Sequence, residues 1–139
     1  MTGHDAPTLL ADHVDLLIEG WSHERPDLNV EPLGVVQRVA RLAMYFAAEI
    51  EPVFTQAGLT GSDFAVLANL RRSGAPYQLT QHDLMASLRL TSGTVSVRVD
   101  HLGERGLVRR EPDPEDGRGV LVTLTDAGNE LFQMVAPVH

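Results

Sequence analysis

The sequence predicts a mainly helical fold with one small β-hairpin. Apolar residues recur at helical spacing over residues 33–54, and residues suited to capping helices stand at short intervals between residues 60 and 126. Two short runs rich in β-branched residues lie at 107–111 and 120–124, separated by a charged segment with prolines and glycines. At 139 residues we expect one domain, since a chain of this length buries roughly two-thirds of its unfolded surface.

Two helices are expected in the N-terminal part. Segment 11–21 carries four large apolar side chains at helical spacing, and Pro26 and Pro32 interrupt regular structure after it. In segment 33–54 successive apolar residues are three or four positions apart, which predicts a helix. A second apolar stripe covers much of the remaining surface of this helix. We therefore expect this long helix to be enclosed on most sides.

Three short helices are expected in the next part of the chain. The pattern Thr-x-x-Asp occurs at 60–63 and again at 80–83, where it resembles a helix cap and opens the first two helices. Thr91 and Ser92 can cap the third helix, which ends at Gly106. Three short helices joined in this way predict a helix-turn-helix.

A hairpin and a final helix complete the predicted order. Segments 107–111 and 120–124 are the two short strands, and the charged tip lies between them. Thr125 and the acid that follows it cap a last helix, which is cut off at His139.

The missing residue types exclude several classes of chemistry. No cysteine is present, which excludes disulfides, thiolate nucleophiles and cysteine-ligated zinc. All 11 basic residues are arginine, so the chain has no Schiff-base lysine and no phosphate-loop lysine. Ser92 and Gly93 do not form a nucleophile elbow. We expect neither an enzyme nor a bound cofactor.

The N-terminal sequence lacks a basic segment followed by an apolar one, so no signal peptide is predicted. Charged residues such as Arg38, Arg41 and Glu49 interrupt the longest apolar clusters, which excludes a membrane span of ~20 apolar residues. We expect a soluble, cytoplasmic protein without a membrane partner.

The net charge of −8 taken alone argues against nucleic acid as a partner. The charge is unevenly distributed, because residues 1–58 hold nine acids and three arginines, whereas residues 78–125 hold seven acids and six arginines. The second region is close to neutral, so the overall charge does not exclude DNA binding there.

Four linked patterns occupy the second half of the chain: SGTVSVRVDHL at 92–102, GLVRR at 106–110, Asp-x-x-Asp-x-Arg at 113–118 and Leu-Thr-x-x-Gly at 124–128. The sequence from Leu79 to Gly128 thereby resembles the winged helix-turn-helix of the MarR family of bacterial transcription regulators. The stretch WSHERPD at 21–27 is similar to the branch with an added N-terminal helix, whose members respond to urate and other small organic acids.

The resemblance implies an obligate homodimer on a pseudo-palindromic DNA duplex. Its recognition helices would enter successive major grooves, its wings would lie over the minor groove, and a small-molecule pocket would lie between the dimer lobe and the DNA-binding lobe. Residues 1–58 would then serve dimerisation and ligand binding, 59–125 would bind DNA, and 126–139 would begin a dimerisation helix. Family members usually end in a long helix, so we expect this last helix to be truncated.

The residues expected to contact DNA stand at two helix starts and at the hairpin tip. Small hydroxyl residues over 91–96 allow close approach to a groove, and Arg98 offers a forked donor to guanine or phosphate. Asp113 and Asp116 can fix the guanidinium of Arg118 for a narrow minor groove. The expected contacts are Gln78, Thr80, Gln81, Thr91, Ser92, Gly93, Thr94, Ser96, Arg98, Asp116 and Arg118. The alternative is a capped surface helix and a solvated charged loop.

A ligand site is expected from the N-terminal half. Trp21 with Arg25, Arg38 and Arg41 would suit a small organic-acid or aromatic effector, because cations beside an aromatic wall bind planar anions. Trp21 can equally anchor a dimer core. An acid often found after the long helix in the urate-responsive branch is replaced here by Ala65.

The sequence thus predicts a DNA-binding transcriptional regulator, a ligand-responsive repressor. One alternative is a winged-helix protein-interaction module without a DNA role, in which the acidic N-terminal half docks a basic partner. Another is a metal-responsive regulator that uses His4, His13 and His23. These histidines are nine and ten residues apart, so no two share a helical turn, and no metal ligand is assigned.

Overall fold

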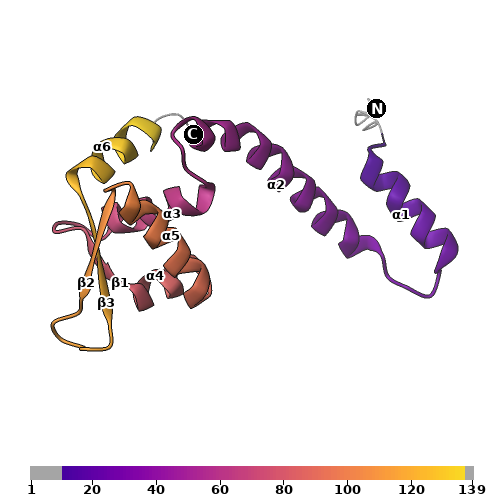
Figure 1. Cartoon of the computed structure of the whole chain (residues 1–139). Coiled ribbons are helices and arrows are strands. Elements are labelled where there is room, and N and C mark those ends of the chain that lie inside the picture. The colour runs from indigo at the N-terminus through magenta and orange to yellow at the C-terminus, as the bar shows by residue number, and fades with distance from the viewer. Residues whose placement is uncertain (1–10, 137–139) are drawn as a thin grey trace, which may run out of the picture. The chain divides into compact units, whose positions relative to one another are not determined.

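The computed structural model describes residues 11–136, which form two compact units that divide between Ala48 and Glu49. The fold is mainly helical with one small antiparallel sheet, as the sequence predicts (Figure 1). The elements are α1 (His13–Glu24), α2 (Glu31–Gln56), α3 (Gly61–Arg72), β1 (Gln78–Thr80), α4 (Gln81–Leu88), α5 (Ser92–Glu104), β2 (Val108–Pro112), β3 (Val120–Leu124) and α6 (Asp126–Val135).

Unit 1, described over residues 11–48, joins α1 to the first part of α2. The carboxylate of Asp12 accepts the backbone N–H groups of Val14 and Asp15 and caps α1, and Asp15 caps Asp12 in return. The guanidinium of Arg38 on α2 reaches both carboxylates, at 3.1 Å and 2.6 Å. Gly34 permits close approach, because a Cβ there would lie 2.8 Å from the side chain of Ile18.

The prediction that the long helix is enclosed is wrong for the described chain. Val35, Met44 and Tyr45 on α2 are 67%, 72% and 64% exposed. Within residues 11–48 only α1 packs against α2, and one short helix covers only one side of a longer one. The apolar periodicity correctly predicted a long helix, but periodicity does not identify the surface that covers an apolar face.

Unit 2, described over residues 49–136, contains the helix-turn-helix and the hairpin. As predicted, Thr60, Thr80, Thr91 and Thr125 each accept a backbone N–H at a helix start. The hairpin β2–β3 pairs Val108 with Leu124 and Pro112 with Val120. The sequence did not predict β1, which adds to the other side of β3 and gives the order β1-β3-β2.

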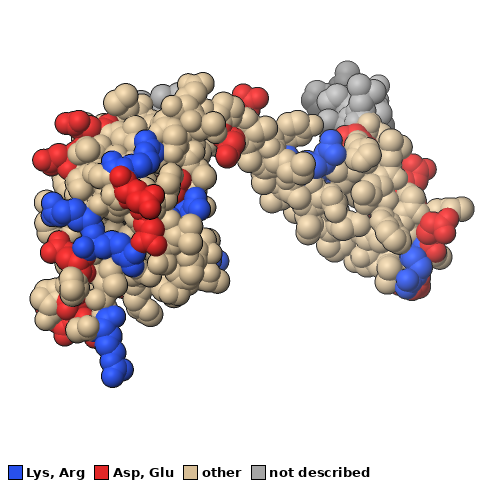
Figure 2. Space-filling model, in the orientation of Figure 1, with Lys and Arg blue, Asp and Glu red and all other residues tan. Residues whose placement is uncertain are grey.

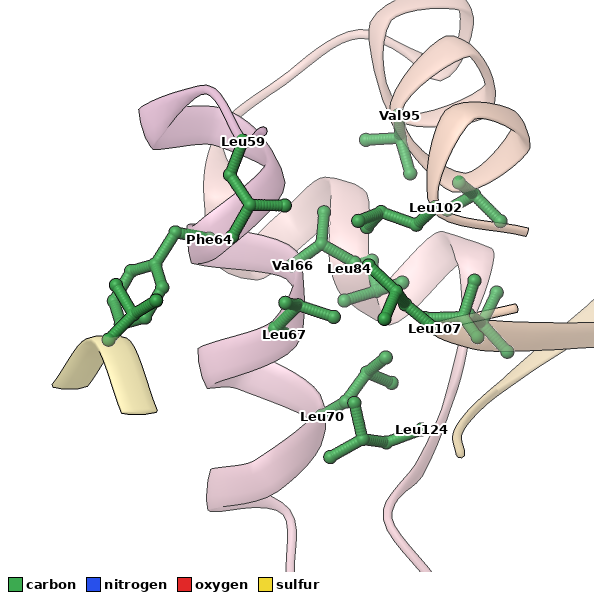
Figure 3. Packing of buried hydrophobic residues seen from close by; sticks show 14 of the residues in the cluster. Leu59, Phe64, Val66, Leu67, Leu70, Leu84, Val95, Leu102, Leu107 and Leu124 are labelled. Atoms are coloured by element: carbon green, nitrogen blue, oxygen red, sulfur yellow. The ribbon is translucent and has the colours of Figure 1, made fainter. Parts of the chain in front are cut away.

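The core of unit 2 lies between these helices and the sheet (Figure 3). Leu67 and Leu70 of α3, Leu84 of α4 and Leu102 of α5 are fully buried. Leu107 and Leu124 bring the hairpin base into the same cluster. This packing holds α5 with one apolar face inward, so its other faces are available for polar contacts.

None of the helices within residues 11–136 is long and apolar enough to span a membrane.

Candidate nucleic-acid interface

The N-terminal end of α5 is an exposed patch of small polar residues. The Oγ1 of Thr91 accepts the backbone N–H of Thr94, and the two hydroxyls lie 2.9 Å apart. Ser92 and Gly93 are exposed, and a Cβ built on Gly93 meets no atom within 4 Å. Ser96 is half-buried one turn further along. The first turn of α5 therefore presents backbone donors and hydroxyls without bulky side chains, which suits contact with phosphate.

Three predicted contacts near the start of α4 already have partners within the chain. The side-chain amide of Gln78 donates to Thr123 at 2.9 Å across the sheet. Thr80 bonds to Asp83 as the helix cap, and Gln81 accepts from Arg110 at 3.3 Å. Their side chains position β1, α4 and β2, and their DNA role stays a prediction.

The hairpin tip carries Arg118, which is exposed, and a basic side chain projects from this end of the hairpin in Figure 2. Asp113 and Asp116 accept the backbone N–H groups of Glu115 and Arg118. Within the described residues neither acid forms an ion pair with the Arg118 guanidinium, contrary to the expectation. The acids instead shape the turn, and the cation is left extended.

Arg98 faces inward on α5 rather than lying free on the surface. Its Nη1 lies 3.5 Å from Oδ1 of Asp63 and 3.4 Å from the hydroxyl of Thr60, and its side chain is 26% exposed. Asp63 is fully buried. The sequence identified Asp63 as a helix cap, and the cap is present, but the ion pair across 35 positions of the chain was missed.

Two further arginines of the site bond to neighbouring segments of unit 2. Arg105 donates to the carbonyls of Gly58 at 2.7 Å and Ala57 at 3.0 Å. Arg110 pairs with Asp100 and joins β2 to α5. Arg98 in α5 and Arg105 at its C-cap are seven residues apart, and this spacing indicates that both face the same side.

Charges of both signs are interspersed on the face of unit 2 that Figure 2 shows. Acids on α5 and the hairpin neutralise part of the arginine charge, as the near-neutral count for residues 78–125 anticipated. Such a surface binds phosphate through a few placed groups and not through a broad positive field.

The predicted ligand residues of unit 1 are only partly brought together. Arg38 and Arg41 line one concavity of about 280 Å³ with Tyr45, whereas Trp21 lines another near the end of α1. Arg38 is paired with Asp12 and Asp15 as described above. The pKa of Asp12 is held below its usual value by hydrogen bonds from the Asp15 backbone N–H and from this guanidinium.

Arg25 is also engaged. It binds both oxygens of Asp27 at 2.8 Å and 2.7 Å, an arrangement that lowers the pKa of that carboxyl. Arg41 has no hydrogen-bond or ion-pair partner among residues 11–136 and borders a second concavity of about 280 Å³ with Met44 and Tyr45. Of the three predicted ligand arginines, Arg41 is the one whose charge no carboxylate of the described residues matches.

The metal hypothesis gains no support from the described residues. Over residues 11–136, no three histidine or carboxylate side chains lie close enough to hold a metal ion. His13 and His23 lie at opposite ends of α1. His4 lies outside the described residues.

Comparison with known proteins places the same region in one family of regulators. Residues 57–119 match the sequence model of the MarR family, and this stretch holds α3, α4, α5 and the hairpin up to its tip. The transcriptional regulator PecS of Dickeya dadantii is 35% identical over 123 residues, which are 88% of this chain and 74% of PecS.

Two further likenesses extend this match. The transcriptional repressor NicR of Pseudomonas putida is 30% identical over 114 residues, covering 79% of this chain and 70% of NicR. Sco3205, a MarR family transcriptional regulator from Streptomyces coelicolor solved in complex with DNA, superimposes with a TM-score of 0.74 at 27% identity. The superposition covers 81% of this chain and 70% of that one.

Proposed function

Because the chain belongs to the MarR family of DNA-binding transcriptional regulators, we propose that it is a repressor that binds a pseudo-palindromic operator as a homodimer. We further propose that a small organic acid releases it from DNA. Members of the family regulate transcription and are not enzymes, so neither catalysis nor a protein-interaction role without DNA is proposed. The relative NicR is named a transcriptional repressor, which supports our proposal that this chain represses transcription.

The observation that carries the DNA-binding proposal is the exposed start of α5. Thr91, Ser92, Gly93 and Thr94 leave the backbone donors of the first turn accessible, and the positive end of the helix dipole points the same way. Arg118 adds an extended cation at the hairpin tip, which suits a narrow minor groove. In a two-fold dimer, two such ends would meet half-sites about one helical turn apart.

Titration of the full chain against the DNA upstream of its own gene tests this proposal. We expect sequence-preferring duplex binding, and we expect Arg118→Ala to lower the slope of log affinity against log salt by about one, since one phosphate contact is lost. Arg72→Ala, which removes an arginine on α3 outside the proposed interface, is the matched control. Equal affinity for the upstream duplex and for a scrambled duplex at low salt would contradict the proposal.

The exposed apolar surface of α2 supports the homodimer. Val39, Leu42 and Phe46 are 60%, 54% and 62% exposed, which is costly for an isolated chain and typical of a face covered by a partner. Sedimentation should give a dimer for the wild-type chain, and Val39→Glu should shift it toward monomer. Gln56→Glu, at the end of α2, is the control for the added charge. A wild-type monomer at all concentrations would contradict a dimer.

An organic-acid effector is supported by Arg41, the one arginine of the predicted ligand set that pairs with no carboxylate among residues 11–136. Arg41 lines two concavities with Tyr45, so a carboxylate can meet a guanidinium beside an aromatic ring. Binding would act by favouring a spacing of the recognition helices that does not match the operator. Urate and benzoate are suitable probes, because a ligand at 100 times its Kd adds about 2.7 kcal/mol to stability.

Thermal unfolding with and without these probes measures that gain. We expect Arg41→Met to abolish the shift and Arg25→Met, whose partner is Asp27, to leave it unchanged. A shift that survives Arg41→Met would place the effector elsewhere.

We propose the cytoplasm as the location of this protein, because its proposed partner is chromosomal DNA.

A further inference from the structure

A row of cationic and polar side chains on α5 faces the corner between α2 and α3. We define this corner as residues 57–63. Arg98 and His101 of α5 and Arg105, its C-cap, are spaced by three and four residues, so they lie on one side of the helix. Figure 3 shows α5 packed beside α3, with Val95 and Leu102 pointing into the shared core.

Asp63 is the acceptor at the centre of this corner. Its Oδ2 accepts the Thr60 backbone N–H at 2.8 Å and lies 3.3 Å from Nδ1 of His101. Its Oδ1 lies 3.5 Å from Nη1 of Arg98. The carboxylate is fully buried, whereas the Arg98 and His101 side chains are 26% and 40% exposed. A buried carboxylate needs partners of this kind, because an unpaired buried charge is strongly destabilising.

A helix cap alone does not account for this arrangement. Capping needs an acceptor for the Thr60 backbone N–H, and one carboxylate oxygen provides it. Within the described part of the chain, the other oxygen has no hydrogen bond and only approaches Arg98. Arg98 in turn is held by two groups of the corner, since Thr60 also faces it at 3.4 Å.

We propose that Asp63 positions α5 for DNA binding, and that Arg98 is the residue through which it acts and not a cation that contacts DNA. This inference rests on the proposed function, since it concerns the same recognition helix. An arginine paired with a buried carboxylate has its charge matched before DNA arrives. It therefore adds little to the release of counterions on which phosphate contacts depend.

Electrostatics alone predicts the opposite effect of a change at Asp63. Removing an acid near a DNA-binding surface should strengthen binding, because repulsion from phosphate falls. A positioning role predicts weaker binding, because α5 loses the anchor of Arg98. The sign of the change in affinity thus separates the two accounts.

The experiment compares Asp63→Asn with Glu104→Gln in the full chain on the upstream duplex. Each variant removes one acid; Asp63 is buried on α3, whereas Glu104 is exposed at the end of α5. We expect Asp63→Asn to lower affinity about tenfold and Glu104→Gln to leave it unchanged or raise it. Arg98→Met should match Asp63→Asn with an unchanged salt slope, and the double variant should bind no worse than either single one.

Arg98→Lys keeps the charge and should restore part of the affinity, which guards against a variant that simply unfolds. Hydrogen exchange of the free protein gives a second readout: the amides of 92–104 should exchange faster in Asp63→Asn than in Glu104→Gln. Unchanged exchange, or a salt slope lowered by one in Arg98→Met, would overturn the inference. Absence of operator binding by the wild-type chain would instead overturn the proposed function, and the exchange result would still stand.

Discussion

The carboxylate of Asp100 on α5 pairs with the guanidinium of Arg110 on β2. The pair joins the recognition helix to the first strand of the wing, and Arg110 extends the link to Gln81 on α4. Both partners are partly exposed, at 53% and 33%. An ion pair of this exposure is a positional link and adds little stability.

We therefore expect Asp100→Asn to lower the free energy of unfolding by less than about 1 kcal/mol. Urea unfolding of Asp100→Asn, Arg110→Met and the double variant gives the coupling between the two side chains directly. The coupling should be about 0.5 kcal/mol, in line with other solvent-exposed pairs. A coupling above about 2 kcal/mol would mean that the pair is part of the core support of α5.

Gly128 allows α6 to pack against the base of the hairpin. A Cβ at this position would overlap the carbonyl oxygen of Leu107 and lie 2.8 Å from the Leu124 side chain. The Thr125 N–H donates to this carbonyl at 3.1 Å, so moving the carbonyl away from a Cβ would break a hydrogen bond. Gly128→Ala should destabilise the protein by about 1–3 kcal/mol through overpacking. Gly20→Ala in α1, where a Cβ meets nothing within 4 Å, is the control and should be neutral or stabilising.

Elements set by local chemistry were predictable from the sequence. The four threonine caps follow a rule that acts within three residues, and each was confirmed at its predicted position. By contrast, β1 escaped prediction because its three residues gain their strand conformation from pairing with β3, more than 40 positions away. Its short sequence carries no β pattern of its own.

The candidate site was predictable where exposure follows from residue type. Gly93 and Arg118 lie in the open, as expected for a helix start and a loop tip. The ion pair of Arg98 was not predictable, because its partner Asp63 stands 35 positions earlier in the chain. A helix cap also seemed a sufficient role for Asp63. For the same reason the sequence did not show that Arg38 is held by Asp12, 26 positions away, and the ligand role of the unit 1 arginines stays a prediction.

Asp12 should make the stability of unit 1 depend on pH. The pKa of this carboxyl is lowered in the folded state, first by the Asp15 backbone N–H and then by Arg38. A lowered folded-state pKa means that the stabilisation is present at neutral pH and is lost as the pH falls through that pKa. Asp12→Asn keeps a good helix cap and removes only the charge.

Thermal unfolding of the wild type and Asp12→Asn between about pH 7 and about pH 3 measures this dependence. At neutral pH the wild type should unfold at a higher temperature than Asp12→Asn. This difference between the two unfolding temperatures should shrink as the pH falls. Glu19→Gln, an exposed change on the same helix, controls for net charge. A difference that is constant across the range would show that the charge of Asp12 does not contribute.

Gly93 offers a test in which stability and DNA binding move in opposite directions. It is the second residue of α5, and a Cβ there meets no atom of residues 11–136 within 4 Å. Gly93→Ala should leave stability unchanged or raise it by up to about 1 kcal/mol, since alanine is the better helix former. The same methyl group would stand between the first turn of α5 and the DNA backbone, so affinity for the operator should fall at least tenfold. Urea unfolding and duplex titration on one preparation measure both quantities, and Gly20→Ala again serves as the control. Unchanged DNA affinity in Gly93→Ala would show that the start of α5 does not approach the duplex closely.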